Sequence, residues 1–267
     1  IIYCRLDRQP ARGRFRAIDK SSEEGDVLHR CASELAQDRL PPGWLLVQSS
    51  RYARVAHNPQ LQLYYKEFLS RSPAESLKAL LRGSRATRAR RNSDALLRAG
   101  INAPANVAWG KLGAGREYLF TRTVPGDGVT CWLRDRLTQR QGRDLLARRR
   151  LLRELGTFIG RAHATGFIHG DLRPGNILVS PQGEHFHFAL IDNERTARYN
   201  PPSGRQLLRN LMQLNMLLPA DLSGRDRMRF FCAWRRQMRD LSRLEAKILA
   251  VEAYHWAMRR LEEKGLL

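Results

Sequence analysis

The sequence predicts an α+β fold of two lobes, a small β-rich N-lobe and a larger helical C-lobe. Three observations favour this class. Between Trp44 and Val124, short runs of β-branched and aromatic residues alternate with turn-forming residues, a pattern typical of strands. The segment Pro125-Gly126-Asp127-Gly128 then interrupts the pattern. Beyond it, apolar residues recur at spacings of three and four, as on one face of a helix.

These observations divide the 267-residue chain into three parts. Residues 1–40 are mixed and polar and are interpreted as an N-terminal extension. Residues 41–124 are predicted to form the N-lobe, and residues 125–267 the C-lobe. A chain of this length is long enough for two lobes that each bury a core.

In the N-lobe, strands are predicted at 44–47, within 49–56 and at 61–68. A helix is predicted over 73–99 with a break at Gly83, because Pro73 suits a first helical turn and Gly100 a C-cap. A short strand within 101–110 and a strand at 117–124 complete the lobe. In the C-lobe, helices are predicted at 129–137, 145–165, 206–218, 225–241 and 244–261.

The most informative motif follows the long helix at 145–165. It reads His169-Gly170-Asp171-Leu172-Arg173-Pro174-Gly175-Asn176, or H-x-D-x-x-x-x-N, and an apolar run follows it. After a turn predicted at 180–183, a second apolar run ends in Asp192. Since two strands joined by a tight turn return the chain to its start, Asp192 is expected beside Asn176. This is the active-site order of the protein-kinase-like phosphotransferases.

Phosphoryl transfer from ATP accounts for these residue types. Asp171 is predicted to accept or orient the proton of the acceptor hydroxyl, and Arg173 to reach the γ-phosphate. Asn176 and Asp192 offer the hard oxygen ligands that Mg²⁺ prefers. His169 is interpreted as a scaffold residue that hydrogen-bonds the backbone, and His163 as a cap or a core hydrogen-bonding residue.

Lys66, Arg122 and Val124 are the candidates for nucleotide binding. Lys66 lies late in the third predicted strand, where kinases keep the lysine that contacts the α- and β-phosphates. It is one of only six lysines in an arginine-rich chain, although an ordinary surface lysine is the alternative. Backbone groups from Arg122 to Val124 are predicted to hydrogen-bond adenine. The sequence shows no glycine-rich loop, and the predicted helix at 73–99 contains only Glu75 and Asp94 as acids.

The net charge of +21 predicts an anionic partner. The candidates are a nucleic acid, an anionic membrane surface and a phosphorylated glycolipid. No apolar run approaches the roughly 18 residues that span a bilayer, and no signal peptide is apparent. The four cysteines are scattered without a C-x-x-C pair, which indicates reduced thiols rather than a zinc site or a disulfide framework.

Several segments resemble the bacterial lipopolysaccharide core kinases, the Kdo/heptose kinase family of the kinase-like fold. They are Ser84-Arg85-Ala86, Arg98-Ala99-Gly100-Ile101, His169-Gly170-Asp171, Leu190-Ile191-Asp192 and the run from Gly224 to Phe231. The resemblance spans roughly Tyr64 to the C-terminus. It implies that ATP and Mg²⁺ are used to phosphorylate a Kdo or heptose hydroxyl. It assigns Lys66 to the nucleotide, Asp171 to catalysis, and Asn176 and Asp192 to the metal.

The resemblance also implies a lipid A–core glycolipid acceptor and an anionic inner-membrane surface as partners. The expected location is cytoplasmic and peripheral, on the inner face of the inner membrane. No specific nucleic acid is expected, and the oligomeric state stays open. One alternative is a kinase-like enzyme acting on a protein or small molecule. The chain has no long activation segment and no Ala-Pro-Glu sequence after Asp192, which disfavours a protein acceptor. The other is a non-catalytic basic module that binds membrane or nucleic acid.

Overall fold

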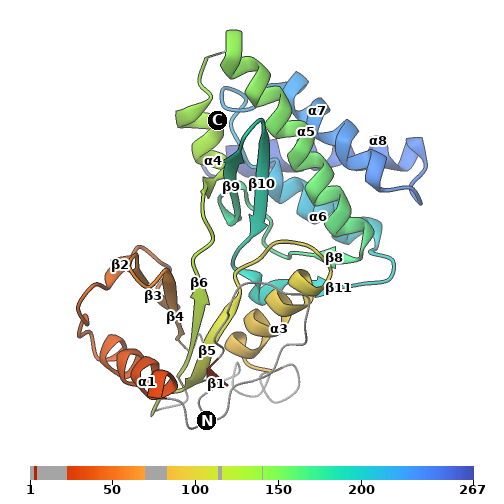
Figure 1. Ribbon diagram of the computed structural model, residues 1–267. Coiled ribbons are helices and arrows are strands. Elements are labelled where there is room, and N and C mark those ends of the chain that lie inside the picture. The colour runs from red at the N-terminus through yellow and green to blue at the C-terminus, as the bar shows by residue number, and fades with distance from the viewer. Residues whose placement is uncertain (1–2, 5–22, 70–82, 114–115, 140) are drawn as a thin grey trace. The chain divides into compact units, whose positions relative to one another are not determined.

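The computed structural model describes residues 3–4, 23–69, 83–113, 116–139 and 141–267 (Figure 1). The chain separates into two compact units. One comprises Ile1–Ala95 and Pro104–Thr123, and the other Leu96–Ala103 and Val124–Leu267. Strands dominate the first unit and helices the second, and the mixed architecture confirms the predicted fold class.

The first unit is built on a six-stranded antiparallel sheet of order β1-β5-β6-β4-β3-β2. The strands are β1 Tyr3–Cys4, β2 Leu45–Val47, β3 Ala53–Asn58, β4 Leu63–Phe68, β5 Asn106–Lys111 and β6 Glu117–Arg122. β6 therefore ends two residues before the predicted boundary at Val124.

One face of this sheet is covered by α1 (Glu23–Ala36). Ala32 and Leu35 of α1 are fully buried in a core that includes Tyr65 of β4 and Phe120 of β6. Part of the segment interpreted as an extension thus contributes to the core of the first unit. α3 (Arg85–Arg98) coincides with the second part of the helix predicted over 73–99. The first part of that helix, with Glu75, lies outside the described residues.

The second unit is mainly helical. Its helices are α4 Val129–Cys131 with a π-helical turn at Trp132–Arg136, α5 Gly142–Ala164, α6 Gly204–Leu214, α7 Gly224–Gln237 and α8 Arg243–Glu262. α5 packs along α7, and α6 packs against α8 (Figure 1). α6 and α7 end four residues earlier than predicted.

Two glycines allow α5 and α7 to approach closely. A Cβ added at Gly156 would lie 2.3 Å from the Phe230 carbonyl oxygen, and one at Gly160 would lie 2.8 Å from the Trp234 carbonyl oxygen. A buried ion pair also joins these helices, since Arg148 Nε donates to Asp226 Oδ2 at 3.1 Å. Burial alone would raise the pKa of Asp226, but the hydrogen bonds from Arg148 and Ser223 outweigh it and lower this pKa.

Small strands frame the loops of the second unit. β7 (Asp127–Gly128), β9 (Ile177–Gln182) and β10 (His185–Leu190) form one sheet of order β10-β9-β7, and β8 (Phe167–Ile168) pairs with β11 (Ala197–Arg198). The turn predicted at 180–183 was placed too early, because β9 continues through Pro181 to Gln182 and the turn is Gly183-Glu184. Pro181 is tolerated since β7 pairs only with Leu178 and Val179, which leaves its other side open.

Candidate active site

The H-x-D-x-x-x-x-N motif lies between β8 and β9, and Asp192 follows β10. The β9–β10 register pairs Ile177 with Leu190, so the residues just outside the ladder meet at the base of the hairpin. There the Ile191 N–H donates to the Asn176 carbonyl at 3.0 Å. The hairpin thus places Asn176 next to the residue that precedes Asp192.

The side chains at this base present oxygen atoms. Asn176 Nδ2 donates to the Asp171 carbonyl at 2.9 Å, which orients the amide and leaves Oδ1 as its remaining ligand atom. Asp192 is exposed and has left-handed backbone angles (φ 61°, ψ 47°), which Asp adopts more readily than most residues. No cluster of three His, Cys, Asp or Glu side chains that could hold a metal occurs in the described part of the chain. One carboxylate and one amide oxygen nevertheless fit Mg²⁺, which keeps several water or phosphate ligands.

Asp171 and Arg173 form a bidentate ion pair. Arg173 Nε lies 2.8 Å from Asp171 Oδ1, and Nη2 lies 2.9 Å from Oδ2. The Asp171 side chain is 15% exposed and that of Arg173 66% exposed, so the guanidinium lies on the solvent side of the carboxylate. Each carboxylate oxygen has two acceptor sites, so Asp171 retains capacity for an acceptor hydroxyl.

A network of amide side chains from α6 holds the backbone of this loop. Asn210 Oδ1 accepts from the His169 N–H at 3.0 Å. Gln213 Oε1 accepts from the Leu172 N–H at 3.0 Å, and Gln213 Nε2 donates to the Gly170 carbonyl at 3.3 Å. The two amides also bond to each other at 3.4 Å. The backbone on both sides of Asp171 is therefore attached to one helix.

His163 and Trp234 extend the network into the core. His163 Nε2 lies 3.3 Å from Asn210 Oδ1, and Trp234 Nε1 donates to His163 Nδ1 at 3.0 Å. Since an indole N–H only donates and Oδ1 only accepts, His163 carries its proton on Nε2. Burial lowers the pKa of His163 to about 4. These contacts confirm the prediction that His163 is a hydrogen-bonding core residue.

His169 supports the loop from a second direction. Its ring is buried, and Nε2 lies 2.9 Å from the carbonyl oxygen of Ile191, the residue before Asp192. Burial lowers the pKa of His169, so the ring is neutral and donates from Nε2. The contact links the two halves of the motif, and it confirms the predicted scaffold role of His169.

Comparison with known proteins now decides the family. The family model described as lipopolysaccharide kinase (Kdo/WaaP) matches residues 44–234. The chain belongs to this lipopolysaccharide kinase family. It is therefore a kinase, as the sequence predicted, and the family fold implies nucleotide use. Among curated proteins, no sequence match was found.

Solved structures similar to this chain were also found. The structure of WaaP in complex with acyl carrier protein matches with a TM-score of 0.56 and 19% identity, over 82% of this chain and 87% of WaaP. The bifunctional kinase-methyltransferase WbdD matches with a TM-score of 0.44 and 20% identity, over 76% of this chain and 47% of WbdD. The PknI kinase domain of Mycobacterium tuberculosis matches with a TM-score of 0.43 and 16% identity, over 84% of this chain and 96% of the PknI domain. At such identities, the WaaP match shows the fold.

The residues assigned to the nucleotide lie around β4 and β6. Lys66 of β4 pairs with Val55 and Leu119 in the ladder, and its Nζ lies 5.2 Å from the centroid of the Phe68 ring. The Arg122 N–H at the end of β6 donates to the Ala105 carbonyl at 2.8 Å. Val124 begins the long segment of the second unit. Their role in this lipopolysaccharide kinase stays a prediction.

The roles of Asn210 and Gln213 were not predicted. The sequence pattern indicated only an amphipathic helix in this region, yet Asn210 is fully buried between Leu207 and Leu211. An amide on the apolar face of a helix is the signal that was available, because a buried polar side chain requires partners. In this lipopolysaccharide kinase those partners are the backbone of the H-x-D loop.

Gly170 offers a direct test of the loop geometry. Its φ is +74°, and an added Cβ would lie 2.6 Å from the Arg195 carbonyl oxygen. We therefore expect Gly170→Ala to displace Asp171 and to lower kcat by about tenfold or more, since small displacements of catalytic groups are costly. Gly175→Ala is the matched control, because a Cβ there meets nothing within 4 Å. Equal activity of both variants would contradict this reading of the loop.

The buried histidine predicts that stability depends on pH. The pKa of His163 is about 4 in the folded kinase and about 6.5 in an unfolded chain. As the pH falls, His163 is therefore protonated in the unfolded chain before it is protonated in the folded one. The stability from neutral His163 is fully present above pH 6.5 and is lost as the pH falls toward 4. Urea unfolding should show a loss of about 2 kcal/mol from this group between pH 8 and pH 5. His163→Gln should flatten that part of the profile, and an unchanged profile would contradict the assignment.

Proposed function

We propose that this kinase uses ATP and Mg²⁺ to phosphorylate a hydroxyl of Kdo or heptose in the inner core of lipopolysaccharide. The observation that supports it best is the pair of hydrogen bonds that join the three site segments. Asn176 Nδ2 donates to the Asp171 carbonyl, and the Asn176 carbonyl accepts from the residue before Asp192. The proposed proton acceptor, Asp171, and the two proposed metal ligands, Asn176 and Asp192, therefore lie on segments joined by hydrogen bonds.

In the proposed reaction, the sugar hydroxyl oxygen attacks the γ-phosphorus of ATP, the bond to the β-phosphate oxygen breaks, and ADP leaves. Asp171 accepts or orients the proton of the attacking hydroxyl. Arg173, 66% exposed, exchanges part of its contact with Asp171 for the γ-phosphate oxygens. Lys66 binds the α- and β-phosphates, and backbone groups from Arg122 to Val124 bind adenine.

Asn176 Oδ1 and the Asp192 carboxylate would hold Mg²⁺. When bound, the ion neutralises the negative charge of the transferring phosphoryl group. The chain's own part is to fix these two oxygens by the β9–β10 ladder and by the Asn176–Asp171 hydrogen bond. Two fixed ligands suffice, since the phosphates and water complete the coordination.

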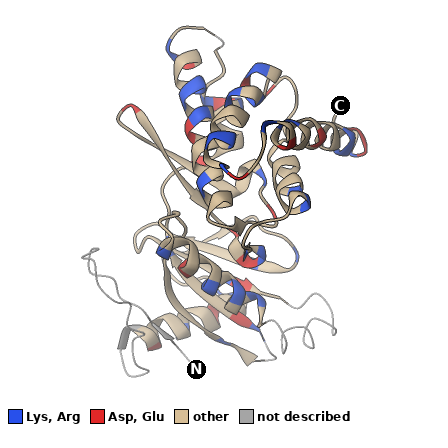
Figure 2. Cartoon of the chain, turned by 90° about the vertical axis from the view of Figure 1, so that its right-hand side faces the viewer, with Lys and Arg blue, Asp and Glu red and all other residues tan. Residues whose placement is uncertain are grey.

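The acceptor that we propose is the lipid A–core glycolipid, reached from the cytoplasmic side at the inner membrane. The family description and the high positive charge support it, because the glycolipid and the membrane surface are both anionic. Basic residues recur along the helices of both units (Figure 2). No helix in the described ranges has the length and apolar content needed to cross a bilayer.

Transfer from γ-labelled ATP to purified deacylated core oligosaccharides tests the function. The wild-type protein should label a Kdo or heptose residue in a Mg²⁺-dependent reaction, and mass spectrometry of the fragments identifies the sugar. Asp192→Ala should abolish labelling, whereas Asp240→Ala, which changes an exposed acid outside the site, should not. Lys66→Met should raise the KM for ATP. Labelling only of a protein or small molecule, with none of the oligosaccharide, would contradict the proposal.

A further inference from the structure

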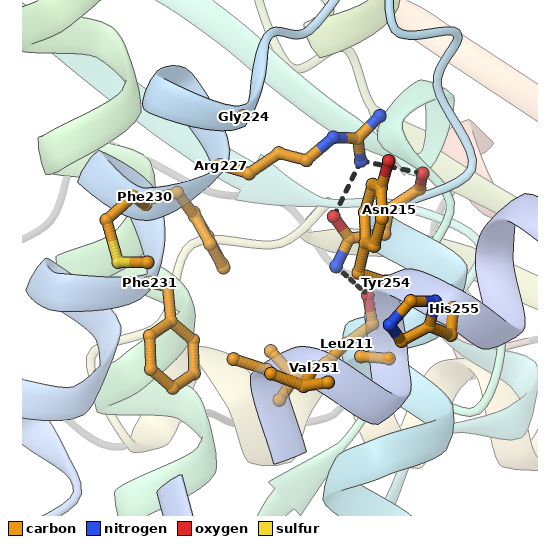
Figure 3. Close-up of a pocket in the computed structure, with 12 residues that line it drawn as sticks. Leu211, Asn215, Gly224, Arg227, Phe230, Phe231, Val251, Tyr254 and His255 are labelled. Carbon is orange, nitrogen blue, oxygen red and sulfur yellow. Dashed lines mark hydrogen bonds between the residues drawn. The ribbon is translucent and has the colours of Figure 1, made fainter. Parts of the chain in front are cut away.

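A largely apolar hollow of about 250 Å³ lies between α6, α7 and α8 (Figure 3). Leu211 forms part of it from α6, Phe230 and Phe231 from α7, and Val251 and Tyr254 from α8. Its main cation is Arg227, whose guanidinium donates to the carbonyl oxygens of Asn215 and Leu217. The hydrogen bonds of Arg227 are therefore made to the neighbouring backbone, and the remaining walls of the hollow can contact an apolar group.

Exposed apolar side chains continue this hollow onto the surface. Leu244, Ile248 and Val251 follow one another on one face of α8 and are 67%, 52% and 45% exposed. Met228 of α7 is 57% exposed and lines the hollow. The inner face of α8 is already occupied by buried residues such as Ala253 and Ala257, so these side chains form a second apolar face. Apolar patches of this kind mark binding surfaces.

Four arginines surround a second hollow, of about 380 Å³, which Met228 also lines. Arg153 comes from α5, and Arg225, Arg229 and Arg236 come from α7. Arg229 forms an ion pair with Asp226 at 3.1 Å. For the other three arginines, no ion pair to an acidic side chain occurs within the described ranges, and no acid lines the hollow. This hollow therefore favours an anion.

Because Met228 lines both hollows, an apolar site and an anion site adjoin on one surface. We propose that this α7–α8 surface docks on the anionic phospholipids of a bilayer. The arginines bind the lipid phosphates, and the exposed apolar side chains insert among the acyl chains. Charge complementarity and the adjoining apolar side chains together favour this occupant, since phospholipids supply phosphate counter-charges for the arginines and acyl chains for the apolar residues. The proposal rests on the proposed function in one respect, that the acceptor is presented at a membrane.

Vesicle sedimentation tests the surface. The full-length protein should bind vesicles that contain phosphatidylglycerol and should bind pure phosphatidylcholine vesicles far more weakly. The triple variant Arg153→Gln, Arg225→Gln, Arg236→Gln should bind the anionic vesicles roughly a hundredfold more weakly, at about fivefold for each arginine near the surface. The matched control is Arg143→Gln, Arg205→Gln, Arg209→Gln, which removes the same charge from exposed positions elsewhere in the second unit. An equal loss in the control would overturn the proposal, because net charge alone would then explain binding.

The apolar part has its own test. The double variant Met228→Gln, Ile248→Gln should bind anionic vesicles more weakly. Its remaining binding should be more sensitive to salt, because it depends on the arginines alone. Leu146→Gln, which changes a side chain 60% exposed on α5, should leave binding unchanged. Labelling of the exposed Cys232 in the arginine hollow by a water-soluble maleimide should slow when vesicles are added, as peptide mapping can show. Unchanged labelling in the vesicle-bound protein would contradict the proposal.

Activity separates this proposal from the proposed function. Phosphorylation of a soluble deacylated acceptor should be the same in the wild type and in both surface variants, while phosphorylation of acceptor embedded in anionic vesicles should fall. A raised KM for the soluble acceptor would assign the arginines to the acceptor and overturn the docking proposal. Dissociation of a lipid-free dimer in the apolar variant would also overturn it, since the surface would then join two copies of the chain. Loss of the function itself would appear as absent transfer to every sugar acceptor.

Discussion

Replacement of Asp171 by Asn is expected to lower kcat for phosphoryl transfer by about a thousandfold. Positioned general bases contribute roughly 10²–10⁴-fold, and an amide cannot accept the hydroxyl proton. The variant keeps the shape of a side chain that is only 15% exposed, and one oxygen can still accept from Arg173. Rapid-quench measurement of a single turnover with saturating ATP reports the chemical step directly.

The controls isolate the role of the carboxylate. ATP affinity and the free energy of unfolding should change little in Asp171→Asn, because the backbone bonds of the loop to Asn176 and α6 do not involve this carboxylate. Asp240→Asn, an exposed acid in the turn after α7, should retain full activity. A single-turnover rate within tenfold of the wild type would mean that Asp171 is not the proton acceptor.

Asn210→Leu is expected to reduce both stability and catalysis. The change leaves two buried donors, the His169 N–H and His163 Nε2–H, without their acceptor. An unsatisfied buried donor costs about 1–3 kcal/mol, so the loss in the free energy of unfolding is about 4 kcal/mol. In the molecules that remain folded, the His169 N–H loses its acceptor on α6 and Gln213 alone holds the loop, so kcat should fall with little change in the KM for ATP.

A conservative variant shows that Asn210 acts through the loop and not only through packing. Asn210→Asp keeps an acceptor oxygen for both donors, so it should recover most of the kcat lost in Asn210→Leu. The added carboxylate lies within hydrogen-bond distance of His163 and should raise the pKa of that imidazole, which NMR titration can follow. If Asn210→Asp and Asn210→Leu had equally low kcat at a temperature where both are folded, the hydrogen bonds would not be the reason.

The sequence predicted local features well where the chemistry is encoded by adjacent residues. The β9–β10 hairpin followed from its apolar runs, and its base places Asn176 beside Ile191 and Asp192. The exact turn was harder to predict, because Pro181 is tolerated only where a neighbouring strand is absent, and that depends on β7. The packing of α1 in the sheet core was also not predicted, since it depends on residues distant in sequence.

The long-range network shows the same limit. Nothing in the pattern of α6 indicates that Asn210 meets the H-x-D loop and His163, which are more than forty positions away along the chain. The bidentate contact of Arg173 with Asp171 was not predicted either, since at a separation of two residues it depends on the loop backbone. The position of Asn210 on the apolar face of a predicted helix was the one clue in the sequence.

The β9–β10 ribbon has one practical consequence. Asn176 and Asp192 adjoin one end of it, and the Gly183-Glu184 turn lies at the opposite end. A ladder tolerates extra residues at its tip, because the pairings nearer its base keep their register. A fluorophore or short affinity tag inserted between Gly183 and Glu184 should therefore report on the enzyme in solution or on vesicles without disturbing its chemistry.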